Sequence, residues 1–179
     1  MTRVRALFVA LVAVASLSLL AGTSRAADEM GTPRTPNAGF DAMKSLAGEW
    51  VGAPHADGKS SSVTYTLVSG RTALMEMLNT PDDSMSMVTM YHPDGQNLLM
   101  THYCGANNQP RMRCARPAAG AKSLTFEFVD CSNLPTPKTG HMHRLVITFV
   151  DADHMTQAWT WKEGAKTSSE IFQFERKKS

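Results

Sequence analysis

The feature that most constrains the fold is a series of short runs, starting at Glu49, in which apolar and polar residues alternate. A period of two residues is typical of half-buried antiparallel strands. Turn residues such as Asp57-Gly58 and Glu163-Gly164 separate the runs. The ten runs cover residues 49–54, 61–69, 72–79, 84–92, 97–104, 110–116, 122–131, 141–151, 154–162 and 167–176. The sequence therefore predicts an all-β fold.

The connections between these runs are short, so each strand is expected to pair with the next one in an antiparallel meander. Such a meander exposes two edges unless it closes into a barrel. Closure also explains why each run has one apolar face, as in Leu124, Phe126 and Phe128. We predict a ten-stranded antiparallel up-and-down β-barrel whose apolar faces line an interior.

One short helix is predicted directly before the first strand. Asn37 or Gly39 is a suitable N-cap, and Phe40 and Met43 lie three residues apart on one face. Leu46 or Ala47 continues this face, and the helix is expected to end at Gly48.

The N-terminus has the order of a secretory signal peptide. Arg3 and Arg5 precede an uncharged apolar run over residues 6–22, and Ser24-Arg25-Ala26 supplies the small side chains that a signal peptidase requires. We predict a signal peptide at residues 1–26 and a periplasmic or secreted product. An uncleaved membrane anchor is the alternative, although the run is slightly short for one.

Residues 27–38 contain Pro33 and Pro36 and show no period, which predicts a flexible leader before a single domain at 39–179. No cysteine lies directly after the apolar run, so we expect no lipid-type membrane anchor. The chain has 18 basic and 16 acidic residues, and three of the basic ones leave with the signal peptide. The resulting near-neutral charge favours no nucleic-acid partner.

Three cysteines, Cys104, Cys114 and Cys131, allow at most one internal disulfide in an oxidising compartment. The spacing does not identify the pair. The alternative is that all three are small buried thiols.

Residues 40–52, FDAMKSLAGEWVG, resemble the opening of the calycin superfamily, which includes lipocalins and fatty-acid-binding proteins. In that family a short helix closes the barrel base and a Gly-x-Trp motif, here Gly48-Glu49-Trp50, enters the first strand. A ten-strand count is similar to fatty-acid-binding proteins and to the haem-carrying nitrobindins. Segments 101–112, 140–144 and 151–154 are similar to uncharacterised exported bacterial calycin-type proteins. The resemblance implies a ligand-binding barrel with Trp50 packed across its closed end.

Several polar residues are candidate ligand anchors. His102 lies in mid-strand on an apolar face, so it is either a hydrogen-bonded core residue or part of a pocket lining. An inward Arg111 would pair with a carboxylate of the protein or of a ligand, and the alternative is a solvated side chain. Fatty-acid-binding relatives hold a ligand carboxylate with arginine and tyrosine, and by residue type this resemblance implies Arg111 together with Tyr65 or Tyr103.

A transition metal or haem is the alternative ligand. His141 and His143 leave the same face of one strand, and His102 or a cysteine thiolate could complete a metal site. Met85 and Met87 share a face as well, and thioethers bind Cu(I), although methionine more often fills irregular apolar space.

The predicted function is that of a carrier or sensor of a small, mostly apolar molecule, because a ten-stranded barrel is too wide for side chains alone to fill. His102, Arg111 and His143 are the expected polar anchors. Trp159 and Trp161 share a strand face and are expected to line the pocket or to pack in the core. The chain contains no recognised nucleophile or phosphate-loop motif, so a binding protein is favoured over an enzyme.

Overall fold

A computed structural model describes residues 36–54, 57–81 and 85–178. The predicted signal peptide and residues 27–35 of the predicted leader lie outside these ranges. No helix in the described residues is long and apolar enough to cross a membrane. The elements are α1 (Ala38–Lys44), β1 (Gly48–Gly52), β2 (Ser62–Val68), β3 (Ala73–Asn79), β4 (Ser86–Asp94), β5 (Asn97–Tyr103), β6 (Gln109–Cys114), β7 (Ser123–Ser132), β8 (His141–Phe149), β9 (His154–Glu163) and β10 (Lys166–Arg176).

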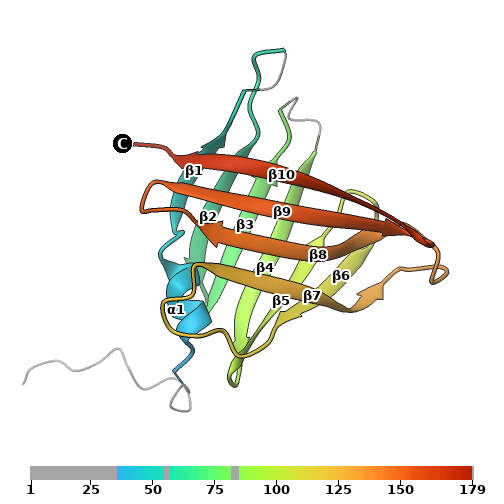
Figure 1. Cartoon of the computed structure of the whole chain (residues 1–179), viewed down its shortest axis with the longest axis horizontal. Helices are drawn as coiled ribbons and strands as arrows, with labels where there is room; N and C mark the ends of the chain where they lie inside the picture. Colours follow the sequence, from blue (N-terminus) through green and yellow to red (C-terminus); the bar gives the residue numbers. More distant parts are fainter. Residues whose placement is uncertain (1–35, 55–56, 82–84, 179) are drawn as a thin grey trace, which may run out of the picture. The chain divides into compact units, whose positions relative to one another are not determined.

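The strands form one closed barrel in which neighbours along the chain pair antiparallel (Figure 1). The circle is closed by β1 and β10, which pair through Trp50 with Arg176 and through Gly52 with Phe174. Each observed strand agrees with a predicted run to within a few residues. The prediction of an all-β, ten-stranded antiparallel barrel with one short N-terminal helix is confirmed.

The core lies inside the barrel, where the inward faces of the strands meet. On β7 and β8 the predicted alternation places Leu124, Phe126, Leu145 and Ile147 at 1% exposure or less. The Phe126 ring meets the Tyr91 ring edge to face at 5.5 Å between centroids. Burial of these side chains is the main source of stability for the fold.

The helix covers one end of the barrel, which we call the closed end. Asn37 is its N-cap, because the Asn37 side chain accepts a hydrogen bond from the Phe40 amide at 2.9 Å. The Asn37 amide group also donates to the carbonyl oxygens of Gly95, in the turn between β4 and β5, and of Asn97, at the start of β5. The helix is therefore fixed to the barrel through its first turn, and Phe40 and Met43 are buried beneath it.

Trp50 packs at the closed end, as the resemblance implied. Its side chain is 1% exposed, and its indole N–H donates to the Leu46 carbonyl at 2.8 Å. The Arg176 guanidinium lies 4.1 Å from the centre of the Trp50 ring. Such a cation–π contact is stronger where water is excluded.

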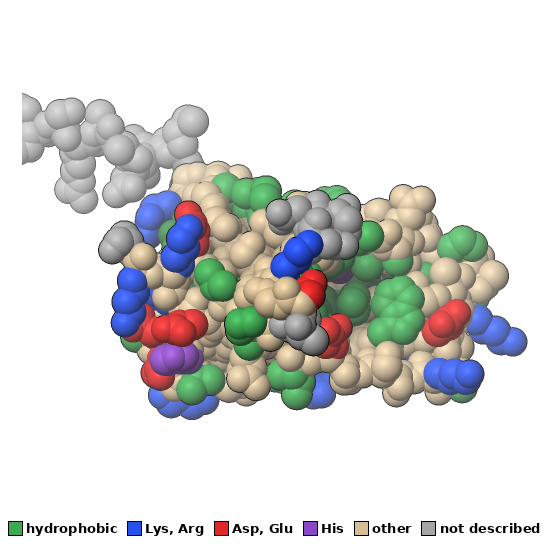
Figure 2. All heavy atoms as spheres, turned by 90° about the horizontal axis from the view of Figure 1, so that it is seen from above, with side chains coloured by type: hydrophobic (Ala, Val, Ile, Leu, Met, Phe, Trp, Pro, Cys, Tyr) green, Lys and Arg blue, Asp and Glu red, His purple; other side chains and the backbone are tan. Residues whose placement is uncertain are grey.

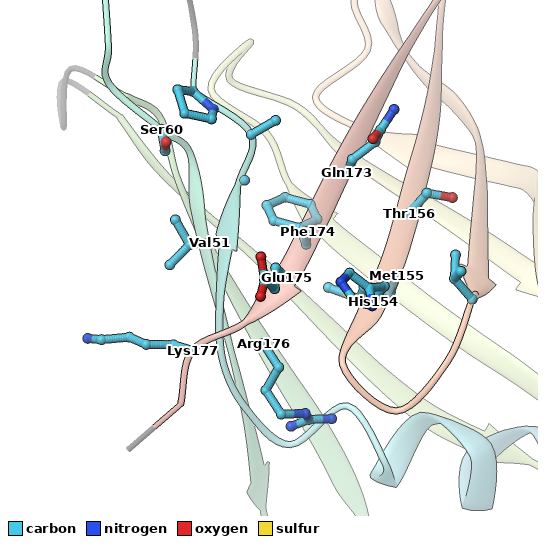
Figure 3. A pocket seen from close by; sticks show the side chains of 14 residues that line it. Val51, Ser60, His154, Met155, Thr156, Gln173, Phe174, Glu175, Arg176 and Lys177 are labelled. Carbon is cyan, nitrogen blue, oxygen red and sulfur yellow. The ribbon is translucent and has the colours of Figure 1, made fainter.

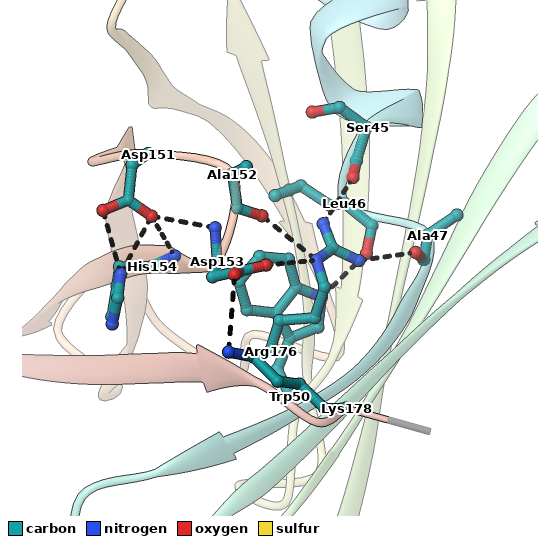
Figure 4. Close-up of polar contacts among 10 residues, drawn as sticks. All are labelled: Ser45, Leu46, Ala47, Trp50, Asp151, Ala152, Asp153, His154, Arg176 and Lys178. Atoms are coloured by element: carbon teal, nitrogen blue, oxygen red, sulfur yellow. Dashed lines mark hydrogen bonds and ion pairs between the residues drawn. The ribbon is translucent and has the colours of Figure 1, made fainter.

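Arg176 also links three segments at this end (Figure 4). Its Nη1 and Nη2 donate to the carbonyls of Ala47 and Ser45, which follow α1. Its Nε donates to the Ala152 carbonyl in the turn between β8 and β9, and Asp153 lies 3.8 Å from the same nitrogen. One side chain from the last strand thus joins the helix, the first strand and the β8–β9 turn.

Candidate functional site

A cavity of about 560 Å³ lies inside the end of the barrel opposite α1. Most of its wall is apolar or aromatic, and the side chains responsible are Leu78, Met87, Met142, Trp159, Trp161 and Phe172. Figure 2 shows the barrel from above, with hydrophobic side chains in the hollowed part of this face and most charged side chains toward its two ends. This cavity is the candidate functional site.

His102, on β5, is a polar group of the cavity lining and is only 2% exposed. Its Nδ1 lies 2.8 Å from the Thr89 hydroxyl oxygen, and its ring packs against the Trp159 ring at 4.7 Å between centroids. Among the described residues, its Nε2 has no hydrogen-bond partner. Burial lowers the pKa of His102 to about 4, so the imidazole is neutral at neutral pH.

A hydrogen-bonded cluster lies behind Trp159 in the barrel interior. The Trp159 indole N–H donates to Gln157 Oε1 at 2.8 Å. Gln157 Nε2 donates to the Tyr65 hydroxyl at 2.6 Å and to Glu76 Oε2 at 3.1 Å. The Tyr91 hydroxyl donates to the same Glu76 oxygen at 2.8 Å. The Trp159 side chain is thereby held in one orientation at the cavity wall.

Glu76 is fully buried in this cluster. Burial raises the pKa of its carboxyl, while hydrogen bonds from Tyr91, Tyr65 and Gln157 act in the opposite direction. Burial also raises the pKa of Tyr65 and Tyr91 well above the usual value, and the nearby Glu76 raises both further. Glu76 Oε1 has no partner among the described residues.

Sequence reasoning missed Glu76 and Gln157, although the alternation contained a signal for both. Glu76 lies on the face of β3 that carries Leu74 and Leu78, and Gln157 lies between Met155 and Trp159 on the inward face of β9. A polar residue at an inward position of a strand requires internal hydrogen bonds, and here these two residues supply them to each other.

Trp161 forms another part of the cavity wall and lies against the backbone of Gly140. A Cβ atom at Gly140 would come within 2.2 Å of Trp161 Cζ2, so only glycine fits beside this ring. Asn108 fixes the same backbone by donating to the Gly140 carbonyl at 2.9 Å. Trp159 and Trp161 both line the cavity. The sequence had left open whether they line a pocket or pack in the core.

Arg111 does not face the interior, so the expectation that it anchors a ligand inside the barrel is wrong. On β6 the inward positions belong to Pro110 and Met112, and Arg111 lies on the outer face with its side chain 56% exposed. There it forms a two-pronged ion pair with Asp130 of β7. Tyr65, which the resemblance paired with Arg111, is buried inside the barrel but is not among the described residues that line the cavity.

A β-bulge changes the orientation expected for His141 and His143. Regular alternation would place both with Leu145 on the inward face, but the register of β8 against β9 shifts between Met142 and Arg144. Met142 is therefore the residue that reaches the cavity. Neither histidine is among the described residues that line it.

The two histidines instead pack together beside Phe128, where β7 and β8 cease to pair. Their rings lie 4.7 Å and 4.9 Å from the Phe128 ring, and His141 Nε2 lies 3.3 Å from His143 Nδ1. Burial lowers the pKa of His143, and Lys162 and His141 lower it further. No group of three or more His, Cys, Asp or Glu side chains in the described ranges could hold a metal ion, so His102 does not join this pair.

Cys104, Cys114 and Cys131 are all free thiols in the structure. Burial raises the pKa of each of them. Cys104 lies near enough to raise the pKa of Cys131, whereas Cys114 is buried at the far end of β6.

A second hollow, of about 720 Å³, lies where β1 ends beside β10 (Figure 3). Its lining includes exposed side chains such as Val51, His154, Glu175 and Lys177. It contains no buried polar atom that lacks a partner among the described residues. The barrel cavity is therefore the better candidate for a specific site.

The fold and the site together define a closed ten-stranded antiparallel β-barrel with a largely apolar cavity at one end. This architecture is compatible with calycin-like folds. No known protein family matches the sequence. No curated protein matches it either.

Proposed function

We propose that the protein is a carrier or sensor that binds a small, mostly apolar molecule in the barrel cavity. The observation that carries this proposal is a cavity of about 560 Å³ with a largely apolar lining and one buried imidazole nitrogen, His102 Nε2, that no described residue partners. Small-molecule sites typically measure about 300–1,000 Å³ and combine an apolar wall with a few polar groups.

The unpartnered nitrogen supports a binding role for an energetic reason. A buried polar atom without a partner costs about 1–3 kcal/mol. A ligand that hydrogen-bonds to His102 Nε2 recovers this free energy. Met87 and Met142 in the same lining have flexible side chains, which can move to admit ligands of different shape.

Export forms part of the proposal and depends on residues 1–26. A periplasmic or secreted carrier would meet its ligand outside the cytoplasm. Intact mass of the secreted protein, with cleavage expected after Ala26, tests this location independently of ligand binding.

Haem is a weaker alternative for this cavity. His102 offers a neutral imidazole nitrogen of the kind that binds iron. However, the described lining contains no Lys or Arg for the two haem propionates, and its charged residue is Glu170. The pair His141 and His143 lacks a third metal ligand among the described residues. Haem and metal ions are therefore included as controls in the binding assay.

Binding of Nile red, an uncharged dye that fluoresces in apolar surroundings, tests the carrier proposal. We expect saturable binding with one dye per protein, and an apolar molecule in native mass spectra of protein purified from its own host. Ser168→Trp places a large side chain at the cavity, at an exposed position of β10, and should weaken dye binding at least about tenfold.

The matched control is Thr167→Trp, one residue earlier on the same strand and outside the described lining. It should bind the dye as the wild type does, and so should Arg111→Ala on the outer face. Absence of both dye binding and a bound host molecule would overturn the proposal. Equal loss of binding in the two tryptophan variants would place the dye outside the cavity, with the same consequence.

A further inference from the structure

The first half of β10 has an edge without a partner strand. β10 begins at Lys166, but only its last residues, from Phe174 to Arg176, pair with β1, which ends at Gly52 (Figure 1). On its other side β10 pairs with β9 along almost its whole length and without a bulge. Among the described residues, no strand lies on the β1 side of residues 167–171, which we call the free edge.

The hydrogen bonds at the end of β10 show which backbone groups point to the free edge. The Ala53 amide donates to the Gln173 carbonyl, and the Lys177 amide donates to the Glu49 carbonyl, both on the β1 side. In an antiparallel strand the N–H and C=O of one residue point to the same neighbour, and the side alternates along the chain. Odd-numbered residues of β10 therefore point toward β1. Those at the free edge are Thr167, Ser169 and Ile171.

The free edge forms part of the wall of the barrel cavity. Ser168, Glu170 and Phe172, at the inward positions of β10, line this cavity. Ser169 lines it as well, although its hydroxyl lies 2.9 Å from the Thr160 hydroxyl on the outer face. The main chain of Ser169 is therefore the part that reaches the cavity. Free N–H and C=O groups thus lie directly beside an apolar hollow.

A row of free main-chain groups is matched by a second extended chain, which pairs with the edge as an added strand. Exposed edges are normally blocked by charged residues, proline or a covering segment. Thr167, Ser169 and Ile171 are uncharged and exposed, with Ile171 at 66%. Ser61 and Pro81 bound the other side of the hollow. The space therefore suits one extended chain better than a second barrel, which would bring its own β9 with it.

Pairing also determines where the side chains of the added chain point. Residues opposite each other in antiparallel strands share one face of the sheet. A partner residue opposite Ser168 therefore points into the cavity, whose wall is mostly apolar. The residue opposite Glu170 meets an exposed carboxylate that forms no ion pair with a described residue. The cavity thus favours a large apolar side chain, and Glu170 favours a basic one two residues away.

We propose that the cavity binds short extended peptides, whose backbone pairs with the free edge of β10 and whose apolar side chain enters the cavity. This inference rests on the proposed binding function and names the ligand class for the same cavity. The peptide carries its apolar residue opposite Ser168 and a Lys or Arg opposite Glu170.

The capped peptide acetyl-Thr-Lys-Thr-Phe-Thr-amide provides the test. When its central threonine pairs antiparallel with Ser169, its lysine lies opposite Glu170 and its phenylalanine opposite Ser168. We expect it to displace Nile red from the wild-type protein. One control peptide has an N-methyl group on the central threonine, which removes an N–H directed at β10, and another has alanine in place of phenylalanine. Each should bind at least about tenfold more weakly, because a hydrogen bond or a buried apolar side chain is lost.

Ser169→Pro tests the free edge in the protein. It removes the central N–H donor without removing a hydrogen bond to β9, since this N–H points away from β9. Proline is tolerated at such positions of an edge strand, so the variant should fold. It should bind the peptide at least about tenfold more weakly. Ser169→Ala keeps the N–H and removes only the hydroxyl contact with Thr160, so its loss should be several-fold smaller.

Amide hydrogen exchange of the wild type provides a measurement that needs no variant. In the free protein the Ser169 amide should exchange much faster than the amides of Ser168 and Glu170, which point toward β9. Addition of the peptide should slow exchange at Ser169 at least about tenfold. Fast exchange at Ser169 that the bound peptide leaves unchanged would overturn the pairing.

The outcomes separate this inference from the proposed function. Saturable Nile red binding that none of the peptides displaces overturns the peptide ligand and leaves the carrier intact. Equal binding of the test peptide and its N-methyl form overturns the pairing with β10. Self-association of the protein that Ser169→Pro abolishes would assign the free edge to a second copy and overturn the proposal. If neither the dye nor any peptide binds, the carrier proposal fails, and this inference fails with it.

Discussion

Acidification should destabilise the protein through His102, and the structure sets the size of the effect. The pKa of the buried imidazole is lowered from 6.5 to about 4, with burial as its cause. Between these values the unfolded chain binds a proton that the folded chain does not, so folding stability falls as pH falls. The loss is about 2 kcal/mol at pH 5 and about 3 kcal/mol at pH 4, and it is absent above the ordinary histidine pKa.

Urea unfolding of the wild type and of His102→Gln, at several pH values between about 7.5 and 4, measures this loss. Glutamine does not titrate, and its amide can retain the hydrogen bond to Thr89. All other titratable groups are common to the two proteins, so their contributions cancel in the difference. Relative to the wild type, the variant should gain about 3 kcal/mol over this range.

Parallel pH profiles for the two proteins would refute the reasoning, because they would show that His102 titrates equally in the folded and unfolded chains. The imidazole would then be open to water in solution, and the assignment of a neutral imidazole at the cavity would lose its basis. A gain by the variant that continues below pH 4 would instead show that the pKa of His102 in the folded protein is lower than about 4. Burial would still be the cause, and the loss of stability on acidification would be larger.

Two further predictions concern the closed end and the buried carboxyl. Arg176→Met removes three hydrogen bonds and the contact with Trp50, so it should cost about 3 kcal/mol in urea unfolding, whereas Lys177→Met, which breaks an exposed pair with Glu49, should change little. Equal losses in the two variants would contradict the role given to Arg176. For Glu76, burial raises the folded pKa, so its contribution to stability is greatest at acidic pH and is lost as pH rises through that value. Glu76→Gln should therefore gain stability relative to the wild type as pH increases, and a gain on acidification instead would show the opposite shift.

The strands and their closure were predictable because they depend on local signals. Alternation identifies a strand and its two faces, and short turns leave antiparallel pairing of neighbours as the only connection. The same reasoning placed His102 inside correctly, since it follows Leu98 and Met100 by even steps along β5. Asn37, the N-cap in the structure, was one of the two candidates that the local sequence offered, together with Gly39.

The orientation of the polar residues was harder to predict because it depends on register and on partners from distant strands. A bulge at one position of β8 brings Met142 to the cavity and leaves His143 outside the described lining, and nothing in the local sequence marks that position. Arg111 was open to both faces in the sequence, and its partner Asp130 lies on another strand. Glu76 and Gln157 are 81 residues apart, so their hydrogen bond is visible only in the folded barrel.

The distribution of side-chain size along the barrel explains how one fold provides both stability and a cavity. On β10 the inward positions change from small or polar residues to aromatic ones, with Ser168 and Glu170 followed by Phe172 and Phe174. Phe174 is 2% exposed, and at the same closed end Trp50 is buried and held by Arg176. Along this strand, large side chains fill the interior near α1, whereas Ser168 and Glu170 at the other end leave space for the cavity between the aromatic side chains of the neighbouring strands. Because Phe174 and Trp50 are buried at the end near α1, away from the cavity, a ligand can replace contacts at the cavity end while these residues keep the other end packed.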